Sequence, residues 1–245
     1  MIRSACVSGR IIRSALLKRA NRRDKGKPPS LRLMYGATRG GFRSLSPVAA
    51  CRVIAGMAEK PESLSSWEVL RRQPHADCRV FTVSRNTCRH PSLGKEADFF
   101  ILESVPWVNV LAITPEKKMV LVRQYRFGVE GFSLEIPGGM ADGKEDPVTA
   151  GVRELREETG YVGRNARVIG VVHPNPAIQN NTCHLVLVED ARCEAEIEWD
   201  HHEEMETVLM DVEEVFALAR SGGITHSLVI DALFFFLPYW EKMKK

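Results

Sequence analysis

The stretch GGMADGKEDPVTAGVRELREETGY, residues 138–161, joins a glycine-bearing loop to the strongest helix signal in the chain. The Asp146 side chain can accept hydrogen bonds from the first N–H groups of a helix, and Pro147 fits the first helical position. Gly160 suits the left-handed residue that ends a helix. These signals predict a helix over residues 147–159, directly after the loop.

The predicted helix has two unlike sides at 100° per residue. Its apolar side can pack on a sheet and holds Val148, Val152 and Leu155. Glu154, Glu157 and Glu158 gather roughly opposite, where like charges repel unless they share a counter-charge. Several carboxylate oxygens select Mg²⁺ or Mn²⁺ over zinc, and Mg²⁺ usually keeps positions open for phosphate oxygens. The helix therefore predicts a divalent-cation site for a substrate that carries a diphosphate.

A cluster of glutamates on a helix is, by itself, usually a solvated face, so its surroundings decide how it is interpreted. Gly138 and Gly139 lack a Cβ, which allows the loop to bring backbone carbonyls close to a shared ion. Arg153 lies beside the glutamates and can orient one carboxylate without filling the space among all three. Both features favour a metal site over a solvated face.

The rest of the chain after about residue 66 alternates short apolar runs with turns. Runs typical of strands are CRVFTVSR (78–85), ADFFILES (97–104), WVNVLAIT (107–114), MVLVRQYRF (119–127), FSLEIP (132–137), ARVIGVVH (166–173), TCHLVLVED (182–190) and ETVLMDV (206–212). The PEKK turn between the third and fourth runs indicates a hairpin. Two more helices are expected, VEEVFALARSGG (212–223) and a last helix over about 226–237 that stops near Pro238. This order predicts an α/β protein with a mixed sheet and helices on its faces.

Residues 1–58 differ sharply from the remainder, because they hold thirteen Arg or Lys and a single acid, Asp24. The segment 1–56 is expected to be disordered or processed. Three explanations stay open: a mitochondrial transit peptide, a basic arm for nucleic acid or anionic lipid, or a start codon placed too far upstream of a genuine start at Met57. We expect a cytoplasmic protein, or a mitochondrial-matrix protein if the transit peptide is genuine.

The sequence fits neither a membrane-spanning protein nor a disulfide-stabilised one. No window offers the eighteen uninterrupted apolar residues of a membrane span, so we expect no membrane partner. The six cysteines form no CxxC pair and are typical of free thiols in a reducing compartment. Nucleic acid is not expected as a partner, because only the basic segment before Met57 would bind it.

The loop and helix also match a family motif. The pattern GX5EX7REUXEEXGU, with U a bulky apolar residue, is met by Gly139, Glu145, Arg153, Glu154, Leu155, Glu157, Glu158, Gly160 and Tyr161. Its one departure is Tyr161, where an aliphatic residue is commoner. On these positions the chain resembles the Nudix hydrolases.

The resemblance extends over roughly residues 66–240. VLVRQYRF, LEIPGG and a later loop with Pro174 and Pro176 are similar to the ADP-ribose pyrophosphatase branch of that family. The resemblance implies an α/β/α sandwich around a mixed β-sheet, with an N-terminal β region (57–107) before the hydrolase domain (108–245). It also implies a homodimer and a small-molecule nucleotide substrate, most simply ADP-ribose or a related nucleotide sugar. Two alternatives stay open, a non-catalytic nucleotide-sensing module and a hydrolase of dinucleoside polyphosphates.

The resemblance assigns roles by position within the motif. Glu154, Glu158 and the Gly138 carbonyl would bind the metal, and Glu157 would be a further ligand or a partial base. Arg153 would orient Glu157, while Gly139 and Gly160 would shape the loop and the helix end. Glu145 would support the loop or a peripheral ion, although a carboxylate near a helix N-terminus is an equally good interpretation.

Residues outside the motif are also implied. Arg126 resembles an arginine that contacts substrate phosphate or ribose, and Arg123 is a near competitor. A general base is expected in the loop DHHEEMET, where Glu203 or Glu204 takes the place of a catalytic glutamate. Without a catalytic role, a run of charged residues of this kind is usually a solvated loop.

Overall fold

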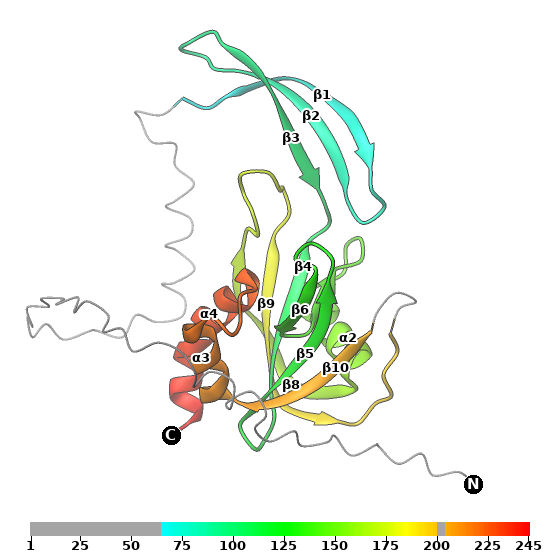
Figure 1. Cartoon of the computed structure of the whole chain (residues 1–245), viewed down its shortest axis with the longest axis vertical. Helices are drawn as coiled ribbons and strands as arrows, with labels where there is room; N and C mark the ends of the chain where they lie inside the picture. Colours follow the sequence, from blue (N-terminus) through cyan, green and yellow to red (C-terminus); the bar gives the residue numbers. More distant parts are fainter. Residues whose placement is uncertain (1–64, 200–203) are drawn as a thin grey trace, which may run out of the picture. The chain divides into compact units, whose positions relative to one another are not determined.

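The computed structural model describes residues 65–199 and 204–245, so the expectations for residues 1–56 and for Glu203 lie outside the described residues. In the described ranges the chain forms β1 (Glu68–Asp77), β2 (Thr82–Arg89), β3 (Glu96–Glu103), β4 (Trp107–Ile113), β5 (Lys118–Arg126), β6 (Gly131–Glu135), β7 (Gly138–Met140), α2 (Pro147–Thr159), β8 (Tyr161–Val172), β9 (Cys183–Cys193), β10 (Met205–Asp211), α3 (Val212–Ser221) and α4 (Ser227–Met243) (Figure 1). No helix within these ranges is long and apolar enough to cross a membrane.

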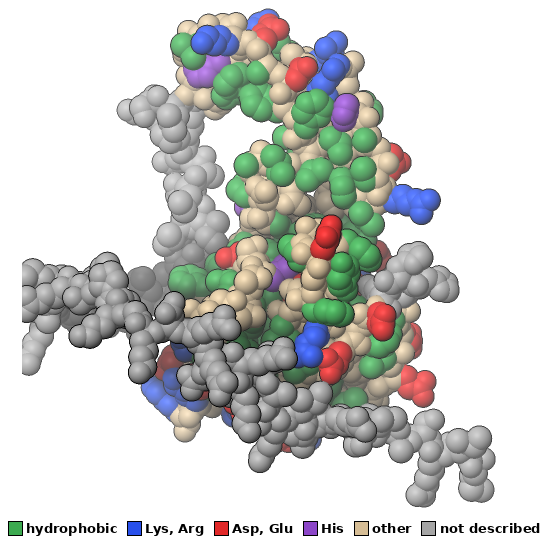
Figure 2. Space-filling view, viewed as in Figure 1, with side chains coloured by type: hydrophobic (Ala, Val, Ile, Leu, Met, Phe, Trp, Pro, Cys, Tyr) green, Lys and Arg blue, Asp and Glu red, His purple; other side chains and the backbone are tan. Residues whose placement is uncertain are grey.

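Strands β1, β2 and β3 form a three-stranded antiparallel sheet, which confirms the predicted N-terminal β region. Strand β1 was not predicted, because almost all its residues are exposed and show no apolar alternation. Strand β2 begins later than expected, since Cys78 and Phe81 close a turn with an N–H to carbonyl distance of 3.0 Å. Large apolar side chains gather over this sheet (Figure 2), among them Trp67, Phe99 and Phe100.

A second sheet contains seven strands, in the order β10-β5-β4-β9-β8, with β6 paired to β5 and β7 paired to β4. The β4–β9 pair is parallel and the other pairs are antiparallel, so the sheet is mixed, as predicted. The predicted β4–β5 hairpin is also confirmed.

Alternating residues of the central strands face two different layers. Val110 of β4 and Val120 of β5 pack in one apolar cluster with Leu155 of α2. Their neighbours Leu111 and Leu121 pack in another cluster with residues of α3 and α4. Helix α2 therefore covers one face and α3 and α4 cover the other (Figure 1), which confirms the α/β/α sandwich.

Helix α4 does not stop at Pro238 but continues to Met243. Proline removes one helical N–H and usually ends or kinks a helix. Here Trp240, two residues on, is 5% exposed, packs in the α3/α4 cluster and donates from Nε1 to Glu213 Oε1 at 2.7 Å. Burial of a large aromatic side chain contributes roughly 1.5–3 kcal/mol. Together with the new hydrogen bond, this offsets the cost of the proline.

Candidate active site

Helix α2 begins and ends where the sequence predicts. The Asp146 carboxylate accepts hydrogen bonds from the N–H groups of Val148 and Thr149, both at 3.1 Å. Gly160 has a φ of 73° and donates its N–H to the Arg156 carbonyl at 2.8 Å. A side-chain cap of this kind stabilises a helix by about 1 kcal/mol. The loop before α2 and the strand after it are thereby held at fixed points.

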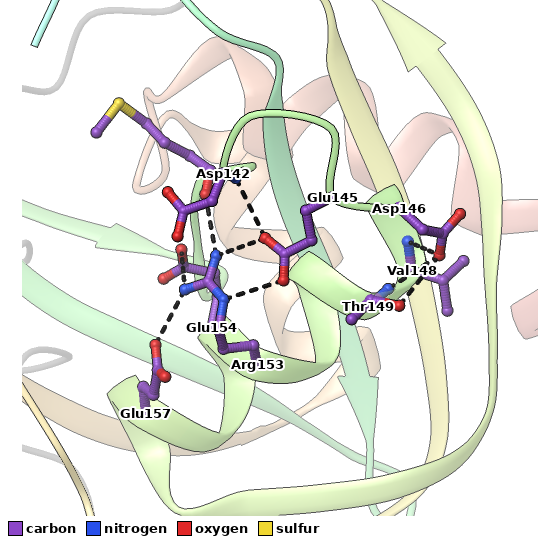
Figure 3. A network of polar contacts seen from close by, with 9 residues as sticks. Asp142, Glu145, Asp146, Val148, Thr149, Arg153, Glu154 and Glu157 are labelled. Carbon is purple, nitrogen blue, oxygen red and sulfur yellow. Dashed lines mark hydrogen bonds and ion pairs between the residues drawn. The ribbon is translucent and has the colours of Figure 1, made fainter.

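Arg153 is the centre of a polar network on α2 (Figure 3). Its Nη1 donates to Glu154 Oε1 and to Glu157 Oε2, each at 3.0 Å. Its Nε and Nη2 donate to the two carboxylate oxygens of Glu145 at 3.2 and 3.0 Å, and Nη2 also reaches the Met140 carbonyl. The sequence indicated that Arg153 orients one carboxylate, whereas in the structure it contacts three.

This network shifts the pKa values of both Arg153 and Glu145. Hydrogen bonding to Glu145 is the largest cause that holds the pKa of Arg153 above its ordinary value. Hydrogen bonding from Arg153 in turn lowers the pKa of Glu145. Glu145 also accepts the Asp142 N–H at 3.2 Å. Its contacts are therefore those of a residue that ties the loop to α2, rather than those of a charge at the helix N-terminus.

Glu158 differs from the other two glutamates. It is 3% exposed, and its Oε2 accepts the Gly138 N–H at 3.0 Å. The expectation that all three glutamates lie opposite the apolar side of the helix is wrong for this residue. Glu158 follows the buried Leu155 by three positions, and residues i and i+3 share a helix face. Its carboxylate is thus held against Gly138 of β7 instead of in solvent.

The two glycines before α2 lie close to their neighbours. A Cβ on Gly139 would come within 2.6 Å of the Glu154 carboxylate. A Cβ on Gly138 would come within 2.2 Å of the Val108 carbonyl oxygen of β4. Both contacts are too short for any real Cβ. The glycines therefore allow β7 to pair with β4 and Glu154 to approach the loop.

The donor atoms here suit a hard divalent cation. The carboxylates of Glu154 and Glu158 lie against the same segment, Gly138 and Gly139. Across residues 65–199 and 204–245, no three His, Cys, Asp or Glu side chains form a ready metal cluster. Arg153 hydrogen-bonds two of the glutamates. Backbone oxygens such as the Gly138 carbonyl would complete an all-oxygen ligand set, which is the kind that Mg²⁺ and Mn²⁺ prefer.

The segment 194–199 after β9 is bound to the C-terminal end of α2. The Glu198 N–H donates to the Glu157 carbonyl at 2.9 Å, and the Trp199 Nε1 donates to the Glu158 carbonyl at 3.0 Å. Sequence reasoning missed Trp199, which carried no motif. Residues 200–203 lie outside the described ranges. Glu204, which follows them, is exposed and directly precedes β10.

The two candidate arginines of β5 lie on different faces of the sheet. Side chains alternate along a strand, so Arg126 and Arg123, three positions apart, project from opposite faces of β5. Arg123 is paired with Leu134, which packs with α3 and α4, and its guanidinium bonds Glu206 at 2.9 Å. Arg126 instead bonds the buried Glu135. Sequence reasoning missed Glu135, although one acid inside the apolar run FSLEIP is a signal that it needs a partner.

Comparisons with known proteins agree with this fold. A family model for the NUDIX domain matches residues 104–232. An ADP-ribose pyrophosphatase of Bacillus subtilis is 32% identical over 54% of this chain and 71% of its own length. One of Saccharomyces cerevisiae is 30% identical over 60% and 68%. The crystal structure of an ADP compounds hydrolase superposes with a TM-score of 0.66 at 21% identity, covering 75% of this chain and 98% of that one, and shows a shared fold.

The mixed sheet, the capped helix and its three glutamates thus define a diphosphate-cleaving class of enzyme, and the chain belongs to the Nudix family. It is a Nudix hydrolase that is similar to ADP-ribose pyrophosphatases. The resemblance inferred from the sequence is confirmed.

Proposed function

We propose that this Nudix hydrolase cleaves the diphosphate bond of ADP-ribose or a related nucleotide sugar, with Mg²⁺ or Mn²⁺ as cofactor. The observation that carries the proposal is the pair of carboxylates, Glu154 and Glu158, held against Gly138 and Gly139. The two relatives named as ADP-ribose pyrophosphatases support the choice of substrate.

The reaction adds water to one phosphorus and breaks its bond to the bridging oxygen, leaving two monophosphates. A bound Mg²⁺ supplies charge neutralisation on the diphosphate and a more acidic water. Glu154, Glu158 and the Gly138 carbonyl would hold it, with Glu157 as a further ligand or a partial base. Arg153 keeps Glu154 and Glu157 in place. Arg126 would contact a phosphate, and Glu204 would accept the proton of the attacking water.

A substrate panel tests this proposal. With Mg²⁺ present, we expect ADP-ribose to give a kcat/KM at least about tenfold above that of dinucleoside polyphosphates, because selectivity arises from contacts beyond the shared diphosphate. Rates are measured by release of monophosphates, with an ADP-hexose as the matched second substrate. A higher kcat/KM for diadenosine polyphosphates would assign the enzyme to the alternative class, and nucleotide binding without turnover would contradict hydrolysis.

We also propose that the enzyme is a homodimer in which the second subunit covers the three-stranded sheet. Trp67 contacts Phe99 on this sheet at a ring distance of 5.3 Å, and His75 contacts Phe100 at 4.8 Å. These aromatic residues remain exposed in the isolated chain, and Figure 2 shows apolar side chains gathered over this sheet. Neighbouring strand residues project from opposite faces, so Phe99 and Phe100 place exposed aromatic surface on both faces of this sheet. Exposed apolar surface marks interaction sites.

Light scattering should therefore give twice the 27.5-kDa mass of the chain. Phe100→Ser is expected to shift the mass towards one chain, because it removes apolar area from the interface. The matched control is Phe234→Ser on α4, which removes an exposed phenylalanine elsewhere and should leave the mass unchanged. A monomeric native protein, or an unchanged mass for Phe100→Ser, would contradict the proposal.

A further inference from the structure

Glu135 at the end of β6 is a buried carboxylate that the reaction described above does not use. Among the described residues, only Glu135 and Glu158 are buried acids, each 3% exposed. Burying an ionised carboxylate is costly unless it is paired and hydrogen-bonded. The contacts of Glu135 therefore indicate why an acid stands in this strand.

Arg126 holds Glu135 through two parallel hydrogen bonds. Its Nε donates to Oε1 at 2.9 Å and its Nη2 donates to Oε2 at 2.6 Å. His226 at the start of α4 lies 3.8 Å from Oε2. Burial alone would raise the pKa of Glu135, but the hydrogen bonds from Arg126 and the nearby His226 outweigh burial and leave the pKa below its ordinary value. The pair is thus an ionised, two-point contact.

The two partners of this contact differ in exposure. The Arg126 side chain is 45% exposed, whereas Glu135 is buried in the sheet. A long arginine side chain loses up to about 2 kcal/mol of rotamer freedom when it is fixed. A guanidinium carries five N–H groups, and the contact with Glu135 engages Nε and Nη2. Glu135 therefore fixes the plane of the guanidinium before any ligand binds.

Glu135 also lies close in sequence to the site. Strand β6 leads through Ile136 and Pro137 into Gly138, whose N–H binds Glu158. The Pro137 carbonyl accepts the Val110 N–H of β4 at 2.7 Å, which fixes this short connection. One segment of four residues thus links the Arg126 guanidinium at its start to the Glu158 carboxylate at its end.

We propose that Glu135 is a positioning residue, which holds the Arg126 guanidinium in the orientation needed to bind a phosphate of the substrate. The proposal rests on the proposed function, in which Arg126 contacts the diphosphate. Arg123 offers no equivalent, because its single contact with Glu206 lies between two exposed side chains on the other face.

A double-mutant cycle tests the proposal. Glu135→Gln removes the charge and one of the two acceptors, while its shape is kept. We expect about a tenfold loss of kcat/KM for ADP-ribose and of affinity for ADP, the size of one lost charge-assisted contact. If Glu135 acts only through Arg126, the same substitution in an Arg126→Ala background should cause no further loss.

The design separates positioning from loss of fold. Thermal midpoints are measured for every variant, and an Arg126→Lys background replaces Arg126→Ala if the unpaired Glu135 unfolds the latter, since lysine cannot make the two-point contact. The matched control is Glu189→Gln, which removes the partner of Arg167 on β8 and should change neither kcat/KM nor ADP affinity.

Two results would overturn the proposal: an equal effect of Glu135→Gln in both backgrounds, or equal ADP affinity in all the proteins. Failure of the native enzyme to hydrolyse ADP-ribose would contradict the proposed function alone, because the ADP titration still decides the role of Glu135.

Discussion

Replacing Glu158 by Gln is expected to lower kcat by on the order of 10²–10³-fold. Metal binding supplies several kcal/mol of transition-state stabilisation, and each 1.36 kcal/mol is a factor of about ten in rate. The carboxylate of Glu158 is buried and fixed by the Gly138 N–H, so no other side chain can take its position without moving the loop. Steady-state hydrolysis of ADP-ribose with Mg²⁺ measures the rate, and calorimetric titration with Mn²⁺ measures the loss of metal affinity.

The same titration separates the metal ligands from the base. Glu204→Gln should retain Mn²⁺ affinity and lose rate at saturating metal, whereas Glu158→Gln should lose both. Glu157→Gln is expected to fall between them, since Arg153 holds this carboxylate beside Glu154. Equal rates in the native enzyme, Glu157→Gln and Glu158→Gln would remove the basis for a metal site on α2, and full activity of Glu204→Gln would move the base elsewhere.

Gly139→Ala should strongly lower the activity of the enzyme while leaving its fold almost intact. The added Cβ would meet the Glu154 carboxylate at 2.6 Å, and that carboxylate is the end of a flexible side chain. It can move aside at little cost in stability, but it then leaves the position that the site requires. A displacement of about 1 Å in such a group can cost about 10²-fold in rate. We therefore expect a kcat/KM reduced by about that factor, with a thermal midpoint close to the native value.

Gly138→Ala is the matched comparison for this substitution. Its Cβ would meet the backbone carbonyl of Val108 at 2.2 Å, and a backbone atom in a central strand cannot move aside. This variant should lose stability as well as activity, with a clear drop in thermal midpoint. If Gly139→Ala keeps full activity, Glu154 does not need the space above Gly139. If the variant unfolds as Gly138→Ala does, a displaced Glu154 carboxylate is not the cause of its lost activity.

Local signals explain which parts of the structure could be predicted. The ends of α2 were predicted to the residue because Asp146, Pro147 and Gly160 act on their own backbone neighbours. Strand β1 was missed because its residues face solvent, so no apolar period marks it. Helix α4 was placed too short because the burial of Trp240 depends on α3, which is distant in sequence.

Some features of the candidate site could likewise be predicted from the sequence, whereas others depend on the fold. The motif named Glu154, Glu157 and Glu158, but the burial of Glu158 depends on how α2 lies on the sheet. The choice between Arg123 and Arg126 depends on the register of β5 against β6, which no spacing in the sequence reveals. Glu135 was visible as an acid in an apolar run, yet only the fold shows that Arg126 is its partner.

The attachment of residues 194–199 to α2 has a consequence for where damaging substitutions occur. Trp199 is forty-one positions from Glu158 in sequence, yet its indole holds the peptide unit from which that carboxylate projects. We expect a change at Trp199, or a residue inserted between Ala195 and Glu198, to displace the main chain of Glu157 and Glu158. Such variants would look like changes in a surface loop, but they would act on the main chain that carries the two proposed metal ligands.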